Sequence, residues 1–137
     1  MEYVNPDSLV PPRGYSHGVR FTPGGQPVFV AGQIGWTGDG RLVAGGLVPQ
    51  FAQALANVLA VVSAAGGGPE SIGQMRIFVT DGADYTAARR PIGEAYRALM
   101  GRHYPAMSVV EVRALLEPGA LVEIEATALV PARPEAP

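Results

Sequence analysis

The order of apolar and polar residues along the chain predicts five strands and two helices. Apolar side chains alternate with polar ones through residues 72–80 and 121–130, whereas residues 50–65 repeat apolar side chains at three- and four-residue steps. Alternation is typical of a strand with one buried face, and the longer step is typical of a helix with one buried face. Further strands are predicted at residues 18–21, 27–31 and 107–115, and a second helix at residues 84–100.

Turn-forming residues separate these elements. Pro23-Gly24-Gly25 and Glu117-Pro118-Gly119 predict hairpin turns between the first two strands and between the last two. Three glycines at residues 66–68 are expected to stop the first helix. Asp84 is expected to cap the second helix, which either kinks at Pro91 or begins next to it.

The predicted order, β-β-α-β-α-β-β, is that of an α+β fold in which a mixed sheet carries both helices on one face. Depending on register, the opposite face carries Val30, Val110, Val112 and Ile124. Another copy of the chain is expected to cover these apolar residues, unless the hairpins curl over them within one chain. Residues 1–137 are taken as one domain with a flexible tail at residues 131–137.

The amino-acid composition excludes several catalytic mechanisms and binding sites for this domain. The 137 residues carry a formal net charge of −2, and all ten basic residues are arginine because the sequence contains no lysine. It contains no cysteine either, so a lysine Schiff base, a P-loop lysine, a cysteine nucleophile and a thiolate metal site are excluded. With only two histidines, no metal site is expected. The slightly acidic balance argues against nucleic acid as a partner.

No membrane association is expected from the sequence. No basic stretch precedes an apolar run near Met1, so nothing there resembles a targeting signal. The longest apolar segment, residues 51–65, is too short to span a bilayer and contains Gln53 and Asn57. A cytoplasmic location is the default expectation.

Acidic residues on the last strand are the first candidates for chemistry. Glu123 and Glu125 share one strand face, where they form either an acid–base pair or an ordinary solvated surface. Glu111 of the preceding strand could join them if Arg76 or Arg113 offsets the repulsion between the carboxylates.

Two loop segments are further candidates. Tyr15, Ser16 and His17 precede the first strand, and Gly32-Gln33-Ile34-Gly35 directly follow the second. The glycines would let a ligand approach backbone N–H groups, although a surface loop and a glycine bulge are the simpler interpretations. No nucleotide-binding motif is present.

Taken together, these segments resemble the YjgF family, also called the reactive-intermediate deaminase (Rid) family or endoribonuclease L-PSP. The resemblance runs from Gly14 to Val130 and is carried by Val30-Ala31-Gly32-Gln33-Ile34-Gly35, Phe78-Val79-Thr80-Asp81, Tyr104-Pro105-Ala106 and Val122-Glu123-Ile124-Glu125-Ala126. It implies a chorismate-mutase-like fold assembled as a homotrimer with central sheets. It also implies a small-molecule ligand in the clefts between subunits.

The resemblance further implies a reaction that needs no cofactor. Members with established chemistry hydrolyse an imine or enamine and release ammonia and a 2-oxo acid. The implied site consists of Tyr15, the backbone of Gly32, Gln33 and Ile34, and Glu123, which positions or activates the water.

One position departs from the family pattern. Where the deaminases carry an arginine that holds the substrate carboxylate, this chain has Met107, and the frequent nearby cysteine aligns with Val109. A thioether cannot replace a bidentate guanidinium, so a less polar binding pocket is expected around Met107 and Val109. Arg20, Arg76 or Arg113 could supply the missing charge from another strand or subunit.

Three functions remain open from the sequence. The first is an imine or enamine deaminase without the usual carboxylate clamp, and the second is a non-catalytic ligand-binding or regulatory module. The third is an endoribonuclease or translation inhibitor, which the family names suggest. The acidic balance and the lack of a basic and aromatic stripe oppose this third function.

Overall fold

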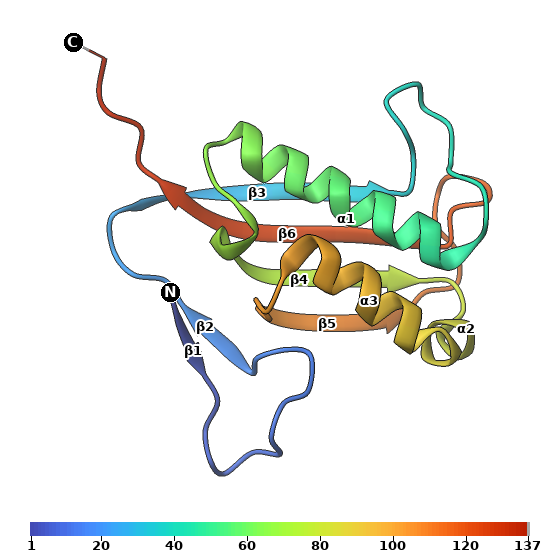
Figure 1. Cartoon of the computed structure of the whole chain (residues 1–137), viewed down its shortest axis with the longest axis horizontal. Helices are drawn as coiled ribbons and strands as arrows, with labels where there is room; N and C mark the ends of the chain where they lie inside the picture. The colour runs from blue at the N-terminus through green and yellow to red at the C-terminus, as the bar shows by residue number, and fades with distance from the viewer. Residues whose placement is uncertain (137) are drawn as a thin grey trace.

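The computed structural model describes residues 1–136 and places two long helices on one face of a four-stranded sheet (Figure 1). The elements in chain order are β1 (Glu2–Val4), β2 (Gly18–Arg20), β3 (Gly25–Ile34), α1 (Leu47–Ala64), a 3₁₀ turn η1 (Pro69–Ser71), β4 (Ile72–Val79), α2 (Gly82–Ala87), α3 (Arg89–Met100), β5 (Ala106–Glu111) and β6 (Val122–Pro131).

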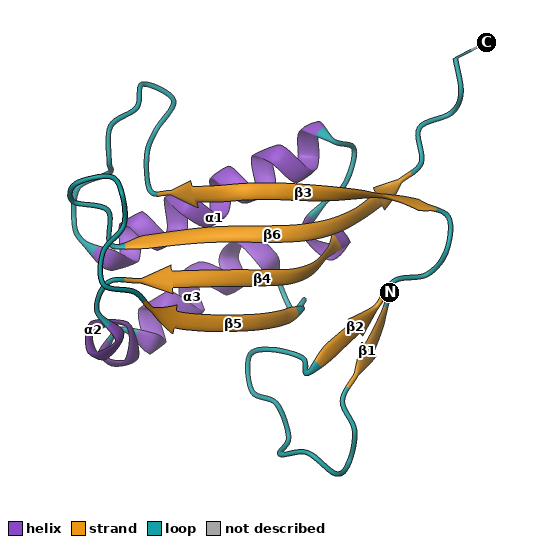
Figure 2. Cartoon of the chain, turned by 180° about the vertical axis from the view of Figure 1, so that it is seen from behind, coloured by secondary structure: helices purple, strands orange, loops and turns teal. Residues whose placement is uncertain are grey.

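The main sheet has the strand order β3-β6-β4-β5. β6 pairs antiparallel with β3 and β4, while β4 and β5 run parallel because α2 and α3 return the chain to the same end of the sheet. Figure 2 shows the face of this sheet that carries no helix. We call it the open face. The expectation of an α+β fold with a mixed sheet and helices on one face is confirmed.

Strict alternation along the central strand β6 divides the two faces. Val122, Ile124, Ala126, Ala128 and Val130 are buried toward the helices, and the residues between them are half-buried on the open face. Buried residues of α1, Phe51, Leu55 and Val58 among them, complete the core against this row. Removing this apolar surface from water is the main stabilising contribution.

Both predicted hairpins are wrong. β2 pairs with β1 in a separate two-stranded sheet, and β3 pairs with β6. β5 and β6 are not neighbours either, because β4 lies between them. A turn signal reports that the chain changes direction, but it does not say which strand becomes the partner.

The helix boundaries also differ from the prediction. Asp81, not Asp84, is the N-cap, and its side chain accepts a hydrogen bond from the Asp84 backbone N–H. The predicted second helix is divided at Ala88 into α2 and α3. Pro91 is the third residue of α3, where its missing N–H leaves no intrahelical hydrogen bond unmade.

α1 begins at Leu47, earlier than predicted, and its 18 residues have a mean hydropathy of 1.5. That length and composition suffice for a membrane-crossing helix, so the sequence argument from a short apolar segment does not hold. However, α1 packs its buried face on the sheet, as the core helix of a globular domain does.

The prediction for the uncovered face is partly wrong. Val30 and Ile124 are buried beneath the helices, because the strand register turns both toward α1. Val110 does lie on the open face, where it is 43% exposed, and Phe29 is 79% exposed there. The open face of a single chain therefore exposes the large apolar side chains of Phe29 and Val110.

The predicted tail, residues 131–137, begins on the last residue of β6. Residues 132–136 form no helix or strand, and Pro137 lies outside the described residues.

Candidate functional site

Glu123 of β6 and Gly32 of β3 are in close contact on the open face. β3 bulges here: Ala31 and Gly32 together stand opposite the single residue Glu125, between the pairs Val30–Ala126 and Gln33–Ile124. A Cβ added to Gly32 would fall 1.9 Å from Glu123 Oε1. The carboxylate therefore occupies space that exists only because residue 32 has no side chain.

Glu123 is the free carboxylate among the three acidic candidates. Glu125 Oε1 accepts a hydrogen bond from Arg76 Nη1 at 3.1 Å, and Glu111 Oε2 accepts one from the Gly82 backbone N–H at 2.6 Å. Within residues 1–136, the carboxylate of Glu123 has no hydrogen-bond or ion-pair partner. The expectation that Glu111 joins the pair is wrong, because its side chain is engaged at the start of α2.

The neighbouring candidates Gln33 and Ile34 are engaged within the fold. Gln33 Nε2 donates to the Ala31 carbonyl at 3.1 Å, and Ile34 is buried. The Ile34 carbonyl accepts hydrogen bonds from Asn57 Nδ2 and from the Trp36 backbone N–H. These contacts fix the end of β3, which directly follows Gly32.

The loop that carries Tyr15 is attached to the beginning of β5. Ser16 N–H donates to the Pro105 carbonyl at 3.0 Å, and Ser16 Oγ donates to the Tyr104 carbonyl at 2.7 Å. His17 is held by the same loop, because its Nε2 donates to the Val10 carbonyl at 2.7 Å. The loop thus brings Tyr15 next to β5, while His17 has a structural role.

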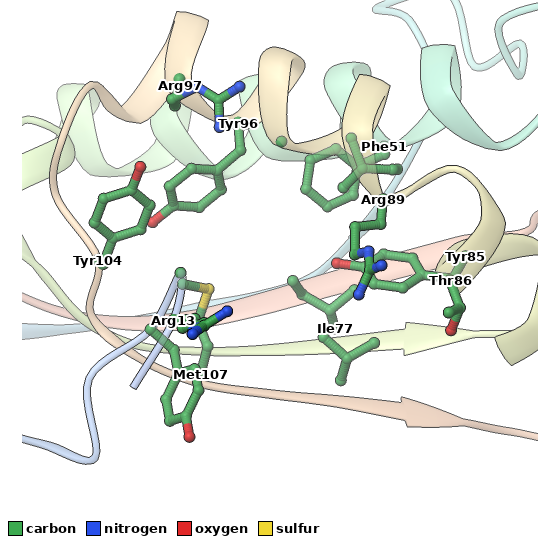
Figure 3. Close-up of a pocket in the computed structure, with 15 residues that line it drawn as sticks. Arg13, Phe51, Ile77, Tyr85, Thr86, Arg89, Tyr96, Arg97, Tyr104 and Met107 are labelled. Carbon is green, nitrogen blue, oxygen red and sulfur yellow. The ribbon is translucent and has the colours of Figure 1, made fainter. Parts of the chain in front are cut away.

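A cavity of about 710 Å³ opens between α3 and the outer strand β5 (Figure 3). We call it the α3 cavity. Three predicted site residues, Tyr15, Met107 and Val109, line it. The remaining lining residues are Arg13, Gly14, Phe51, Ile77, Tyr85, Thr86, Arg89, Ile92, Gly93, Tyr96, Arg97 and Tyr104. The lining around Met107 therefore combines apolar and aromatic side chains with three arginines.

Three arginines, Arg13, Arg89 and Arg97, line the α3 cavity, and no acidic residue does. In the part of the chain that the structure describes, no salt bridge involves any of the three. A cluster of cationic groups without counter-charges creates a positive potential that attracts anions.

The arginines suggested by the sequence do not line this cavity. Arg20 pairs with Glu2, and Arg76 pairs with Glu125 on the open face. Arg113 is exposed beyond the end of β5 and is not a lining residue. Within one chain, none of these three supplies the charge missing at position 107.

Buried Tyr96 and half-buried Tyr85 and Tyr104 add hydroxyl groups to the α3 cavity. Tyr96 stacks on Tyr104 with ring centroids 5.4 Å apart, and its hydroxyl donates to the His103 carbonyl at 2.6 Å. Burial raises the pKa of Tyr96 and of Tyr85, so both hydroxyls stay protonated at neutral pH. The Tyr85 hydroxyl has no hydrogen-bond partner among the described residues and can donate to a ligand.

The predicted site residues fall into two groups on opposite sides of the sheet. Met107 and Val109 stand beside Met75 and Ile77, whose side chains are buried toward the helices. Glu123 stands beside Phe78, on the other face. One chain alone therefore cannot bring Glu123 and Met107 to the same ligand.

Sequence reasoning missed Arg13, Arg89 and Arg97. Arg89 and Arg97 are eight residues apart on one side of α3, with Gly93 between them, and this spacing was a usable signal. Arg13 had no such signal, because its place depends on the hydrogen bonds of Ser16 to the start of β5.

Residues 1–136 contain no group of three or more His, Asp or Glu side chains arranged to hold a metal ion.

Known proteins resemble this chain in sequence and in structure. Residues 6–130 match the family described as Endoribonuclease L-PSP. Over 103 residues, covering 74% of this chain and 71% of the relative, it is 37% identical to the RutC family protein UK114 of Drosophila melanogaster. It is 30% identical over 103 residues to the 2-iminobutanoate/2-iminopropanoate deaminase of Homo sapiens, covering 74% of this chain and 72% of that protein.

A solved structure agrees with the sequence matches. The Rid family protein YyfB from Yersinia pestis, described as a protein of unknown function, superposes with a TM-score of 0.83. It is 34% identical in sequence, and the superposition covers 94% of this chain and 98% of that chain. The chain therefore belongs to the endoribonuclease L-PSP family, which is also known as the YjgF or Rid family.

Proposed function

We propose that this protein is a homotrimeric deaminase that hydrolyses imines or enamines of amino-acid origin in clefts between its subunits. The observation that carries the proposal is the free carboxylate of Glu123 lying directly on Gly32. Relatives named 2-iminobutanoate/2-iminopropanoate deaminase support this choice of reaction. Residues 1–137 would act as one domain, in the chorismate-mutase-like arrangement that the family resemblance implies.

The proposed position of the cleft follows from the placement of the site residues on opposite faces of the sheet. Glu123 is on the open face and Met107 is on the helix side, so a ligand that touches both must lie between two chains. The exposed Phe29 and Val110 make the open face a suitable subunit interface. A closed trimer with its sheets at the centre would cover these side chains and form three equivalent clefts.

Each residue then has a distinct role in hydrolysis. Water adds to the C=N carbon while the Glu123 carboxylate accepts one of its protons, and the nitrogen is protonated. Collapse of the resulting carbinolamine breaks the C–N bond, so that ammonia leaves and a 2-oxo acid remains. Tyr15 and the backbone around Gly32, Gln33 and Ile34 would stabilise charge that develops on oxygen.

A second candidate, a non-catalytic ligand-binding module, is favoured by one specific observation. Met107 occupies the position at which the family resemblance implies an arginine for the substrate carboxylate. Ligand binding that raises the melting temperature without turnover would select this second function.

The direct test of the first candidate is ammonia release from imines generated in situ by an amino-acid oxidase. Wild-type protein should accelerate release, and Glu123→Gln should reduce the acceleration by about 10²-fold or more while Arg90→Gln preserves it. Arg90 is exposed, pairs with Glu94 and does not line the α3 cavity, so it serves as a matched control. No acceleration with any imine or enamine of a broad panel would refute the deaminase proposal.

A further inference from the structure

We propose that the α3 cavity binds 2-imino acids with an aromatic side chain, and the corresponding 2-oxo acids, and that Arg13 holds their carboxylate in place of the residue at position 107. The reacting C=N group rests on the proposed function. Recognition of the carboxylate and of the aromatic ring rests on the α3 cavity alone.

The size of the cavity suits a bulky ligand. Its volume of about 710 Å³ lies within the range of about 300–1,000 Å³ that is usual for sites binding drug-sized molecules. A three- or four-carbon imino acid would leave most of this space to water and would gain little from the apolar wall. A phenyl or indolyl side chain would reach Ile77 and Ile92, which are buried at the base.

The wall of the cavity is suited to an aromatic ring in particular. Phe51 and Tyr85 meet at 60° with centroids 6.4 Å apart, while Tyr96 and Tyr104 stack within 11° of parallel. These two pairs come from different elements and all four rings line the cavity. A further ring can add edge-to-face or offset contacts, each contributing about 0.5–1.5 kcal/mol beyond area burial.

The charge of the cavity favours an anionic ligand. Its lining has three guanidinium groups and no carboxylate, whereas Arg20, Arg41, Arg76 and Arg90 each have an acidic partner. The side chain of Arg97 lies along α3 over Gly93: a Cβ added to Gly93 would be 3.2 Å from Arg97 Nη1. A carboxylate is the simplest anion that this set complements.

Among the three arginines, Arg13 is the one placed to replace the family arginine. Figure 3 shows Arg13 at the Met107 end of the cavity, whereas Arg89 lies at the end with Tyr85 and Ile77. The Arg13 loop is held to β5 by the two hydrogen bonds of Ser16. The carboxylate would therefore lie beside Met107 and the aromatic ring toward Tyr85, with Arg89 and Arg97 adding to the positive potential.

Calorimetric titration of the intact protein with stable probes tests this inference without any turnover. The probes are 3-phenyl-2-oxopropanoate, pyruvate, and the matched pair 3-phenylpropanoate and 3-phenylpropanamide. Both aromatic carboxylates should bind at least about tenfold more tightly than pyruvate and than the amide, as expected for a charge-assisted contact together with ring burial.

Variants assign the carboxylate contact. Arg13→Gln should weaken 3-phenylpropanoate binding by about tenfold or more and leave amide binding unchanged, whereas Arg89→Gln and Arg97→Gln should each weaken it only about two- to fivefold. Arg90→Gln, one residue from Arg89 on the same helix, should bind as wild type does. Circular dichroism melting of each variant confirms that it is folded.

The outcomes separate this inference from the proposed function. Tight binding of aromatic carboxylates without hydrolysis of any imine supports the inference and contradicts the deaminase. Hydrolysis of short imino acids with pyruvate binding as tightly as the aromatic acids overturns the inference and leaves the deaminase standing. Unchanged carboxylate binding in Arg13→Gln overturns the assignment of Arg13.

Discussion

The side chain of Glu123 can take its position only because Gly32 has no side chain. A Cβ on residue 32 would lie 1.9 Å from Glu123 Oε1, 2.7 Å from its Cδ and 2.9 Å from its Cγ. All three distances are shorter than Cβ contacts in folded proteins, so any other residue at position 32 must displace the carboxylate. The glycine in the β3 bulge therefore determines where the proposed catalytic carboxylate of Glu123 can lie.

The first prediction concerns this contact. Gly32→Ala should leave the fold intact, because Glu123 can rotate away, but it should reduce imine hydrolysis by about a hundredfold through misplacement of the carboxylate. Gly38→Ala is the control, since a Cβ there meets nothing within 4 Å. Steady-state ammonia release and thermal melting would be measured for both. Full activity in Gly32→Ala would mean that the position of Glu123 is irrelevant to catalysis.

The second prediction distinguishes two neighbouring carboxylates on one strand face. Glu123→Gln should reduce kcat by about 10²- to 10⁴-fold, the usual contribution of a general acid–base group. Glu125→Gln should have a small effect, because Glu125 is already paired with Arg76 at an exposed site. Equal losses in the two variants, measured at saturating substrate, would contradict a specific role for Glu123.

The third prediction introduces at position 107 the arginine that the family resemblance implies. Met107→Arg should tighten pyruvate binding by about tenfold through a bidentate contact and should weaken binding of 3-phenylpropanoate by crowding the cavity. Met107→Leu keeps the apolar character and should preserve the wild-type preference. Titration calorimetry on both variants measures the switch, and an unchanged ratio of the two affinities would place the carboxylate elsewhere.

The fourth prediction concerns the open face. Phe29 is 79% exposed there, and Phe29→Asp should dissociate the assembly into monomers by placing a charge in the proposed interface. Val61→Asp is the control, because Val61 is exposed on α1, away from the sheet. Sedimentation velocity should give a trimer for wild type and for Val61→Asp. An unaltered trimer in Phe29→Asp would show that subunits associate through another surface.

The sequence was most informative where structure is local and periodic. Alternation along 121–130 correctly separated the residues of β6 into two faces, with Glu123 and Glu125 together on one of them, but it did not show which face the helices cover, because Ile124 was expected on the uncovered face and is buried. The sequence did not predict pairing between distant segments. The turn after Phe21 suggested a hairpin, yet β3 pairs with β6, about a hundred residues later. Long-range pairing depends on the packing of the whole sheet, not on the turn.

In the candidate site, too, individual residues could be predicted from the sequence, whereas their arrangement in space could not. The resemblance identified Glu123, Gly32 and Met107, and the structure adds that the sheet separates Glu123 from Met107. Arg13 could not be predicted, because two hydrogen bonds of Ser16 to residues almost ninety positions away place its loop beside Met107. The resemblance, through Met107, predicted a changed pocket, but it gave no information about Arg13, Arg89 and Arg97, which line that pocket.

Complementation between two inactive variants tests the two-subunit cleft most directly. Glu123→Gln removes the proposed base, and Val109→Trp fills the α3 cavity from a residue that is 43% exposed. If each cleft combines Glu123 of one chain with the Val109 wall of its neighbour, random trimers from an equal mixture have one intact cleft in four. Mixed trimers should then recover about a quarter of wild-type ammonia release, although either variant alone is inactive. No recovery in trimers shown to be mixed would contradict a cleft built from two chains.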